Sequence, residues 1–194
     1  MDVAGKVLAR LGIARVHLRG HFCPARHAAA HWRDAAKRGE KVDARIINTT
    51  SGAGLQGSVG QAAYSAAKGG IASLTLVQAA ELARYGVTAN AIAPAARTRM
   101  TEAVFAGAMK KPDEGFDAMD PANISPIVVW LGSPASRAVT GRVFDIAGGR
   151  ITVEEGWNDG PTIDHPARWS PTEIGDVVTK LLAGARAPKK VWGM

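Results

Sequence analysis

Three side chains, Ser51, Tyr64 and Lys68, stand out in a stretch that otherwise consists mostly of Gly, Ala and Ser. Tyr64 and Lys68 are four residues apart, so in a helix they share one face and lie about 6 Å apart along the axis. An ammonium group beside a phenol favours the phenolate and lowers a pKa that starts near ~10. Such a tyrosine can exchange a proton with a carbonyl or alcohol oxygen, and a serine hydroxyl can hydrogen-bond the same oxygen. Taken alone, the Tyr-Lys pair also fits an ordinary helix surface.

The sequence around these residues alternates between strand and helix patterns. The β-branched run Ala44–Thr50 predicts a buried strand that ends just before Ser51, and Gly52–Gly60 predicts a Gly-rich loop. Residues 61–85 are Ala-rich and contain no proline, which predicts a helix that Gly86 ends. Three further elements are expected: a strand over Val87–Pro94, a helix from Asp120-Pro121 to Leu131 and a strand over Gly141–Gly149. This alternation predicts an α/β fold with a parallel sheet covered by helices on both faces.

The two ends of the sequence have other patterns. Residues 3–37 read as helical, and Pro24 within them predicts either a kink or two successive helices. Residues 150–194 are irregular apart from Ser170–Glu173, a capping box that opens a last helix. We therefore expect two parts, an α/β core over residues 1–149 and a C-terminal extension over residues 150–194.

In this order, the strand ending Asn-Thr-Thr-Ser51, the motif Tyr64-Ser-Ala-Ala-Lys68, the Ala-rich helix and the strand Val87–Pro94 resemble the short-chain dehydrogenase/reductase family. The resemblance covers most of residues 16–182. It implies that Ser51 positions the substrate oxygen and that Tyr64 is the catalytic acid/base. It also implies that Lys68 binds the ribose hydroxyls of the nicotinamide and favours the ionised tyrosine.

The segment after the second predicted strand extends the resemblance. In the family, a Pro-Gly pair and a following Thr or Ser hold the nicotinamide carboxamide, and the matching residues here are Pro94, Ala95 and Thr98. Ala95 replaces the glycine of the family pattern. The resemblance therefore implies NAD or NADP as the cofactor, bound at Tyr64, Lys68, Pro94, Ala95 and Thr98. A simple strand-to-loop turn is the alternative interpretation of Pro94 and its neighbours.

Several segments are similar to a narrower group within the family. Val16–Gly20 and Ala93–Phe105 resemble the 3-hydroxyacyl-CoA dehydrogenase unit of the peroxisomal multifunctional β-oxidation enzyme and its actinobacterial hydroxysteroid-type relatives. Ile124–Ser133 and Gly156-Trp157 continue this similarity toward the C-terminus. It implies an NAD(P)-dependent oxidoreductase that transfers hydride between nicotinamide and a secondary alcohol or ketone of lipid metabolism. The expected partners are an acyl-CoA or steroid substrate and further copies of the chain in a homo-oligomer.

The family pattern is incomplete at the N-terminal side. No Gly-rich turn that cradles a dinucleotide pyrophosphate follows a strand anywhere in the sequence. We therefore expect a partial doubly wound (Rossmann-type) sheet whose N-terminal dinucleotide-binding half is missing, and we expect cofactor binding by this chain to be weak. Two alternatives stay open: a truncated, inactive remnant that serves as an oligomerisation or interaction module, and an inert fragment.

The composition indicates the cellular compartment and the kinds of partner to expect. The net charge of +7 arises largely from Lys and Arg spread through the N-terminal helical region, without the aromatic residues or motifs of nucleic-acid-binding proteins. We expect a solvated basic face, or a weaker role in attracting an anionic acyl-CoA, and no nucleic-acid partner. No apolar run is long enough to span a membrane, and no secretory signal begins the sequence. Cys23 is the only cysteine, which favours the cytoplasm.

The histidines and the tryptophans allow further expectations. His17 stands where many family members have an asparagine that completes a proton relay, and the alternative is a helix histidine without a role. His17/His21 and His27/His31 have helical spacing, but no carboxylate or thiol cluster joins them, so no metal site is expected. Four tryptophans read as core or cap residues: Trp130, Trp157, Trp169 and Trp192.

Overall fold

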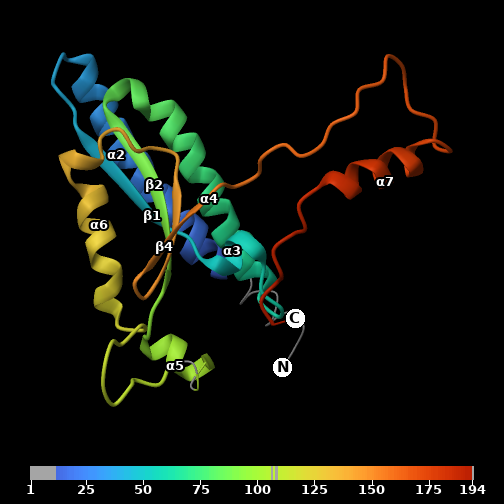
Figure 1. The fold of residues 1–194 in the computed structure, drawn as a ribbon. Helices are drawn as coiled ribbons and strands as arrows, with labels where there is room; N and C mark the ends of the chain where they lie inside the picture. The colour runs from blue at the N-terminus through green and yellow to red at the C-terminus, as the bar shows by residue number, and fades with distance from the viewer. Residues whose placement is uncertain (1–11, 106, 108, 194) are drawn as a thin grey trace. The chain divides into compact units, whose positions relative to one another are not determined.

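A computed structural model describes residues 12–105, 107 and 109–193 of the chain. The chain divides into two compact units, one made of Met1–Glu154 together with Val191–Met194 and the other of Glu155–Lys190. The first unit contains the sheet and its covering helices (Figure 1). Residues 3–11 of the expected N-terminal helix lie outside the described residues.

The described residues of the first unit form a four-stranded sheet in the order β1-β2-β3-β4. Its strands are β1 (Ala44–Thr49), β2 (Val87–Ala95), β3 (Val143–Ala147) and β4 (Arg150–Glu154). The first three strands are parallel, which confirms the predicted α/β architecture. Their carboxyl ends therefore lie at one end of the sheet, where Thr49 pairs with Ile92 and Ala95 pairs with Ala147.

The strand β4 was not expected from the sequence and runs antiparallel to β3. The expectation of irregular structure directly after Gly149 was therefore wrong. Gly148 and Gly149 form the two-residue connection of a β-hairpin, with Gly148 at a φ of +60°. The side chains of β4 are mostly exposed, so no buried apolar run marks this strand in the sequence.

Helices cover both faces of the sheet (Figure 1). α2 (Gly20–Lys37) and α4 (Ala62–Leu82) lie on one face, and α6 (Ser125–Gly132) lies on the other. Two short helices, α3 (Gly52–Gln56) and α5 (Arg99–Phe105), follow β1 and β2 in the chain. Shorter helical turns are η1 (Arg15–Arg19), η2 (Ala83–Tyr85), η3 (Pro121–Ile124) and η4 (Pro134–Ser136). The predicted cap at Asp120 is confirmed, because its side chain accepts the Ala122 N–H at 2.8 Å.

Apolar side chains form a core on each face of the sheet. On the face covered by α4 and α2, Ile46, Val87 and Ala89 pack with Ala79, and Trp32 of α2 lies against them. On the other face, α6 contributes Ile127 and Leu131 to a cluster with three strand residues, Ile92, Phe144 and Ile146. The parallel strands are thus covered on both faces, as a parallel sheet with helices on both sides requires.

The N-terminal helical segment is continuous rather than a pair of separate helices. It continues from residue 12 to Lys37 and contains a π-helical turn at Arg15–Arg19, just before Pro24. Pro24 has no N–H to donate to the Gly20 carbonyl, which lies four residues earlier. The π-helical turn and this lost bond lie in neighbouring turns of the same helix.

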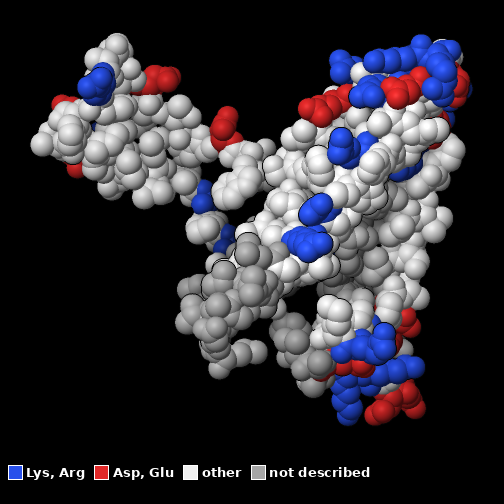
Figure 2. Space-filling model, turned by 180° about the vertical axis from the view of Figure 1, so that it is seen from behind, with Lys and Arg blue, Asp and Glu red and all other residues white. Residues whose placement is uncertain are grey.

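Basic side chains of the first unit are mixed with acidic ones. Figure 2 shows Lys and Arg beside Asp and Glu at two ends of this unit, with a largely uncharged surface between them. Four ion pairs lie around the N-terminal helix and β1: Arg33–Asp34 at 3.0 Å, Arg38–Glu40 at 2.7 Å, Arg45–Asp43 at 2.6 Å and Arg137–Asp43 at 3.1 Å. The basic region is therefore a partly paired, solvated surface. In the described part of the chain, no helix has the length and apolar character to span a membrane.

The second unit, Glu155–Lys190, contains the helix α7 (Ile174–Gly184). This helix begins later than predicted, because the Ser170 hydroxyl accepts the N–H of Thr172 instead of forming a capping box with Glu173. Trp169 stacks on His165 with ring centroids 4.3 Å apart. Trp157 is fully exposed, so its interpretation as a core or cap residue was wrong.

Candidate active site

Ser51 lies at the carboxyl end of β1. The N–H of Thr50 donates to the Ile92 carbonyl at 2.8 Å, which continues the pairing of the two strands to the residue before Ser51. The Ser51 hydroxyl oxygen accepts the Ala53 N–H at 3.2 Å and caps α3, a helix within the segment that the sequence predicts as a loop. Because the oxygen acts as acceptor in this bond, the Ser51 hydroxyl hydrogen can donate to another oxygen.

Lys68 is buried against the same end of β1. Its Nζ donates to the Thr49 carbonyl at 2.7 Å, and its own carbonyl accepts the Thr50 hydroxyl at 2.6 Å. Burial lowers the pKa of the Lys68 ammonium below its ordinary value. An ammonium group has three N–H donors, and the bond to Thr49 uses one of them.

A close approach of two helix backbones places Lys68 at this position. A Cβ atom on Gly54 of α3 would lie 2.6 Å from backbone atoms of Lys68 and Gly69 in α4. Real Cβ contacts essentially never occur at this distance, so only glycine at position 54 permits the contact. The small residues around Tyr64 thus have a packing role that their abundance alone did not specify.

Buried polar side chains set the position of α4 along β1. The Asn48 amide donates to the Thr75 hydroxyl at 2.9 Å and to the Gln78 side-chain oxygen at 2.8 Å. All three residues are buried, and hydrogen bonds in a buried setting favour one arrangement over its neighbours. This arrangement carries Tyr64 and Lys68 to the carboxyl end of the sheet.

Tyr64 lies near both the Lys68 ammonium and the ring of His17. The ammonium is 5.8 Å from the Tyr64 ring centroid, and the His17 ring meets the Tyr64 ring edge-on with centroids 5.1 Å apart. Burial, then the positive charge of Lys68 and then His21 lower the pKa of His17. The residue that the sequence comparison placed at the relay position is thus adjacent to the tyrosine.

His21 connects the N-terminal helix to β1. Its Nδ1 lies 2.7 Å from the His17 carbonyl oxygen, and its Nε2 accepts the Thr49 N–H at 3.3 Å. With Nε2 as the acceptor for Thr49, Nδ1 is the nitrogen that can donate to the His17 carbonyl. No group of three or more His, Cys, Asp or Glu side chains within the described ranges is arranged to hold a metal ion.

Pro94 and Ala95 lie at the carboxyl end of β2, and Thr98 follows it. Pro94 and Ala95 are the last residues of the strand and are half-buried. Thr98 is exposed, and its hydroxyl oxygen accepts the Thr101 N–H at 3.2 Å at the start of α5. Strand pairing brings Pro94 and Ala95 to the same end of the sheet as Ser51.

An ion pair that the sequence did not reveal holds the segment after β2. Arg97 donates to the Asp117 carboxylate through both terminal nitrogens, one of them at 3.3 Å, and to the Met109 carbonyl at 3.2 Å. The Arg97 guanidinium holds the pKa of the Asp117 carboxyl below its ordinary value. The pair joins residues twenty positions apart, so no local pattern could indicate it.

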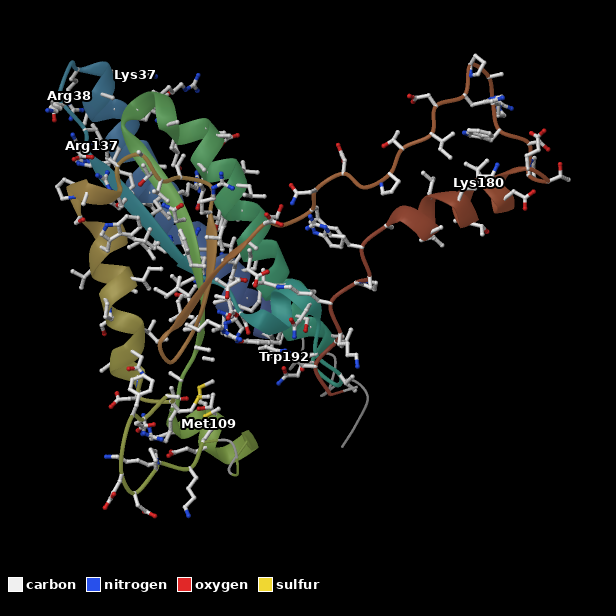
Figure 3. All side chains as sticks on the ribbon, in the orientation of Figure 1. Lys37, Arg38, Met109, Arg137, Lys180 and Trp192 are labelled. Atoms are coloured by element: carbon white, nitrogen blue, oxygen red, sulfur yellow. The ribbon has the colours of Figure 1, made fainter. Side chains whose placement is uncertain are left out.

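The C-terminal residues Val191–Gly193 return to the segment between Ser51 and Tyr64. The Trp192 N–H donates to the Gly57 carbonyl at 3.2 Å, and the Trp192 carbonyl accepts the Val59 N–H at 2.9 Å. Figure 3 shows Trp192 beside α3. The sequence interpretation of Trp192 as a core or cap residue did not anticipate this position, and no motif around it pointed to the site.

The sequence of this chain matches a known protein family. The family model described as short chain dehydrogenase matches residues 12–108. The chain belongs to this family. The family resemblance inferred from Ser51, Tyr64 and Lys68 is therefore confirmed, while the roles of the individual residues remain predictions.

Individual members of the family extend the match beyond residue 108. Hydroxyacyl-CoA dehydrogenase ChsB1 of Mycobacterium tuberculosis is 44% identical over 175 residues, which cover 89% of this chain and 55% of that protein. A solved short chain dehydrogenase from Mycobacterium avium is 59% identical with a TM-score of 0.84, over 95% of this chain and 60% of that one. A solved 4-hydroxyisoleucine dehydrogenase in complex with NADH and succinate is 26% identical with a TM-score of 0.54, over 70% of this chain and 56% of that one. The chain thus spans somewhat more than half the length of these relatives.

Proposed function

We propose that this chain is the catalytic part of an NAD(P)-dependent dehydrogenase that interconverts a secondary alcohol and a ketone. The proposed substrate is a 3-hydroxyacyl-CoA or a hydroxysteroid, and the name of the M. tuberculosis relative, hydroxyacyl-CoA dehydrogenase, supports the first. The observation that carries the proposal is the Lys68 ammonium 5.8 Å from the Tyr64 ring, at the end of β1 where Ser51 begins the next helix.

The chemistry assigned to these residues is proton transfer at one oxygen. In the direction of reduction, Tyr64 gives its phenolic proton to the ketone oxygen, and Ser51 donates a hydrogen bond to the same oxygen. The positive charge of Lys68 stabilises the negative charge left on the tyrosine. In the direction of oxidation, the ionised tyrosine accepts the proton of the alcohol.

The residues present fit the nicotinamide end of the cofactor. The buried Lys68 ammonium retains two donors beyond its bond to Thr49, and these suit the ribose hydroxyls. We propose that Pro94, Ala95 and Thr98, together with Tyr64, contact the nicotinamide, which supplies the hydride when bound. The solved 4-hydroxyisoleucine dehydrogenase contains NADH, which supports a nicotinamide cofactor, NAD or NADP.

The pyrophosphate end of the cofactor has no matching motif in this sequence. We propose that the chain by itself binds NAD(H) weakly and that the portion of the relatives that it does not match provides the Gly-rich turn. The proposed location is the cytoplasm, on the basis of the single cysteine. We expect this chain to bind neither a membrane nor a nucleic acid.

A homo-oligomer is proposed from the outer faces of α2 and α4. Large apolar side chains are about half exposed there, namely Phe22, Leu76 and Val77. Exposed apolar patches on a protein surface often mark sites of contact with another protein. Light scattering coupled to size-exclusion chromatography tests this proposal, and a monomer at tens of micromolar contradicts it. The same surface supports the alternative function, an inactive oligomerisation module.

Activity of a chimera distinguishes the two functions. The part of the M. avium protein that this chain does not match is fused to this chain, and reduction of a 3-oxoacyl-CoA or a ketosteroid is followed through NADH and NADPH absorbance. We expect turnover by the chimera and weak NADH binding by the chain alone, measured by calorimetry. A folded chimera without activity on either substrate would refute the enzymatic proposal and favour the module.

A further inference from the structure

The indole of Trp192 lies against Gly52, the residue that follows Ser51 (Figure 3). A Cβ atom on Gly52 would lie 2.4 Å from two ring carbons of the indole, Cζ2 and Cη2. The indole therefore occupies the space that a side chain at position 52 would fill. Glycine at this position allows the ring to reach the backbone beside Ser51.

Backbone contacts hold the tail that carries this indole. The two hydrogen bonds of Trp192 with Gly57 and Val59 form a parallel β-bridge at Ser58. The Val191 side chain lies 3.4 Å from the position that a Cβ on Gly57 would take. Trp192 is thus attached to the segment that joins Ser51 to Tyr64, the two residues proposed to contact the reacting oxygen.

Trp192 is not fully covered by these contacts. Trp192 is 45% exposed, although tryptophan is buried to a high degree in most proteins. In open α/β sheets, ligands bind outside the carboxyl ends of the strands, which is where Ser51 and the tail lie. A flat aromatic face in that place offers apolar contact to a ligand group that extends away from the reacting carbonyl.

We propose that Trp192 is a specificity-determining residue whose indole forms an apolar wall of the substrate site and packs against the acyl chain of a long 3-oxoacyl-CoA. This inference rests on the proposed function, because the ligand is its proposed substrate. A short acyl group ends before it reaches the wall, whereas a long one gains contact area with it. The C-terminal tail then selects for chain length without touching the reacting atoms.

Calorimetric titration of the full chain with acetoacetyl-CoA and 3-oxodecanoyl-CoA tests this inference. We expect Trp192→Ala to raise the dissociation constant of the long-chain ligand about tenfold and to leave that of the short ligand within about twofold. The control is Trp157→Ala, which removes an exposed tryptophan of the second unit and changes neither constant. Trp192→Phe keeps a smaller ring and gives an intermediate loss, and it serves as the test if the alanine variant does not fold.

A second variant acts on the same contact from the other side. Gly52→Ala puts a methyl group where the indole lies, so we expect the same selective loss of the long-chain ligand, with no further loss when it is combined with Trp192→Ala. Unchanged long-chain affinity in Trp192→Ala, or an equal loss for both ligands, overturns the inference and leaves the proposed function standing. If the unmodified chain binds neither ligand, the proposed substrate class fails and the inference fails with it.

Discussion

The segments that follow β1 and β2 lie at the same end of the sheet, yet different interactions hold them. After β1, three contacts join uncharged groups: the Thr50 hydroxyl with the Lys68 carbonyl, the Ser51 oxygen with a backbone N–H, and Gly54 with the backbone of α4. The Lys68 ammonium adds one charged contact, to the Thr49 carbonyl. After β2, the segment depends on the ion pair between Arg97 and Asp117.

The two segments therefore differ in how their contacts respond to pH. The segment with Ser51 is held mainly by hydrogen bonds between neutral groups and by close packing, and these contacts do not change with pH near neutrality. The segment with Thr98 depends on a charge pair whose side chains are only 14% and 13% exposed, so acid weakens the pair, whereas salt screens it little. We expect perturbations of the first segment to reduce function most and those of the second to depend on conditions.

The largest expected effect is on turnover. In the active chimera, Tyr64→Phe removes the transferable proton and should lower turnover at least ~10²-fold, the usual scale for a general acid/base. Thr98→Val removes one hydroxyl and should lower it by no more than about tenfold, the value of one hydrogen bond. Steady-state kinetics with a 3-oxoacyl-CoA measures both. Near-normal turnover in Tyr64→Phe would refute the assignment of the acid/base.

The next effect is on stability. Gly54→Ala forces a methyl group into the backbone contact of α3 with α4 and should cost about 1–3 kcal/mol of unfolding free energy. The matched control is Gly132→Ala, where the structure describes no atom within 4 Å of the new Cβ, so little loss is expected. Urea unfolding measures both variants. Equal stability of the two would show that the contact does not position Lys68.

A smaller effect concerns acid. Because its folded pKa is lowered, Asp117 contributes stability that is present above its ordinary pKa of ~3.9 and is lost as pH falls through the lowered value. The difference in melting temperature between the unmodified chain and Asp117→Asn should therefore vanish at low pH. Thr50→Val removes a neutral hydrogen bond, so its difference should be independent of pH. If the difference in melting temperature for Asp117→Asn does not change with pH, the segment after β2 does not depend on the charge of Asp117.

The smallest effect is a shift in the titration of His17. Burial and then the charge of Lys68 lower the pKa of this imidazole, so Lys68→Met should raise it part of the way to its ordinary value of ~6.5. Chemical shifts of the His17 ring protons between pH 4 and pH 8 report the midpoint. An unchanged midpoint would mean that the Lys68 ammonium does not act on the groups around Tyr64.

The family was recognisable from the sequence because its signals are local. Tyr64 and Lys68 share a helix face because of the helical period, and the run before Ser51 is a strand because β-branched residues pack well in a buried sheet. Gly86 was expected to end a helix, and it does so in the left-handed conformation at the end of the turn after α4. The order of these elements then sufficed for the α/β architecture.

Other features depend on residues far apart in the chain. The helix α3 within the expected loop, the exposed strand β4 and the pairing of Arg97 with Asp117 have no periodic pattern to mark them. No motif in the sequence indicates the contacts of Asn48, whose side chain bonds Thr75 and Gln78 of α4 in the fold. Sequence spacing carries no information on such contacts, since they arise only when separate elements pack.

By itself, the sequence determined the family and most of the element types, and it singled out the side chains proposed to carry chemistry, because backbone periodicity and residue type act over a few neighbouring positions. The tertiary structure alone decided which groups surround those side chains. It placed the Lys68 ammonium on the Thr49 carbonyl, the His17 ring at the edge of Tyr64 and the Trp192 indole on Gly52. These contacts join segments up to 140 residues apart, and packing, not local preference, brings them together.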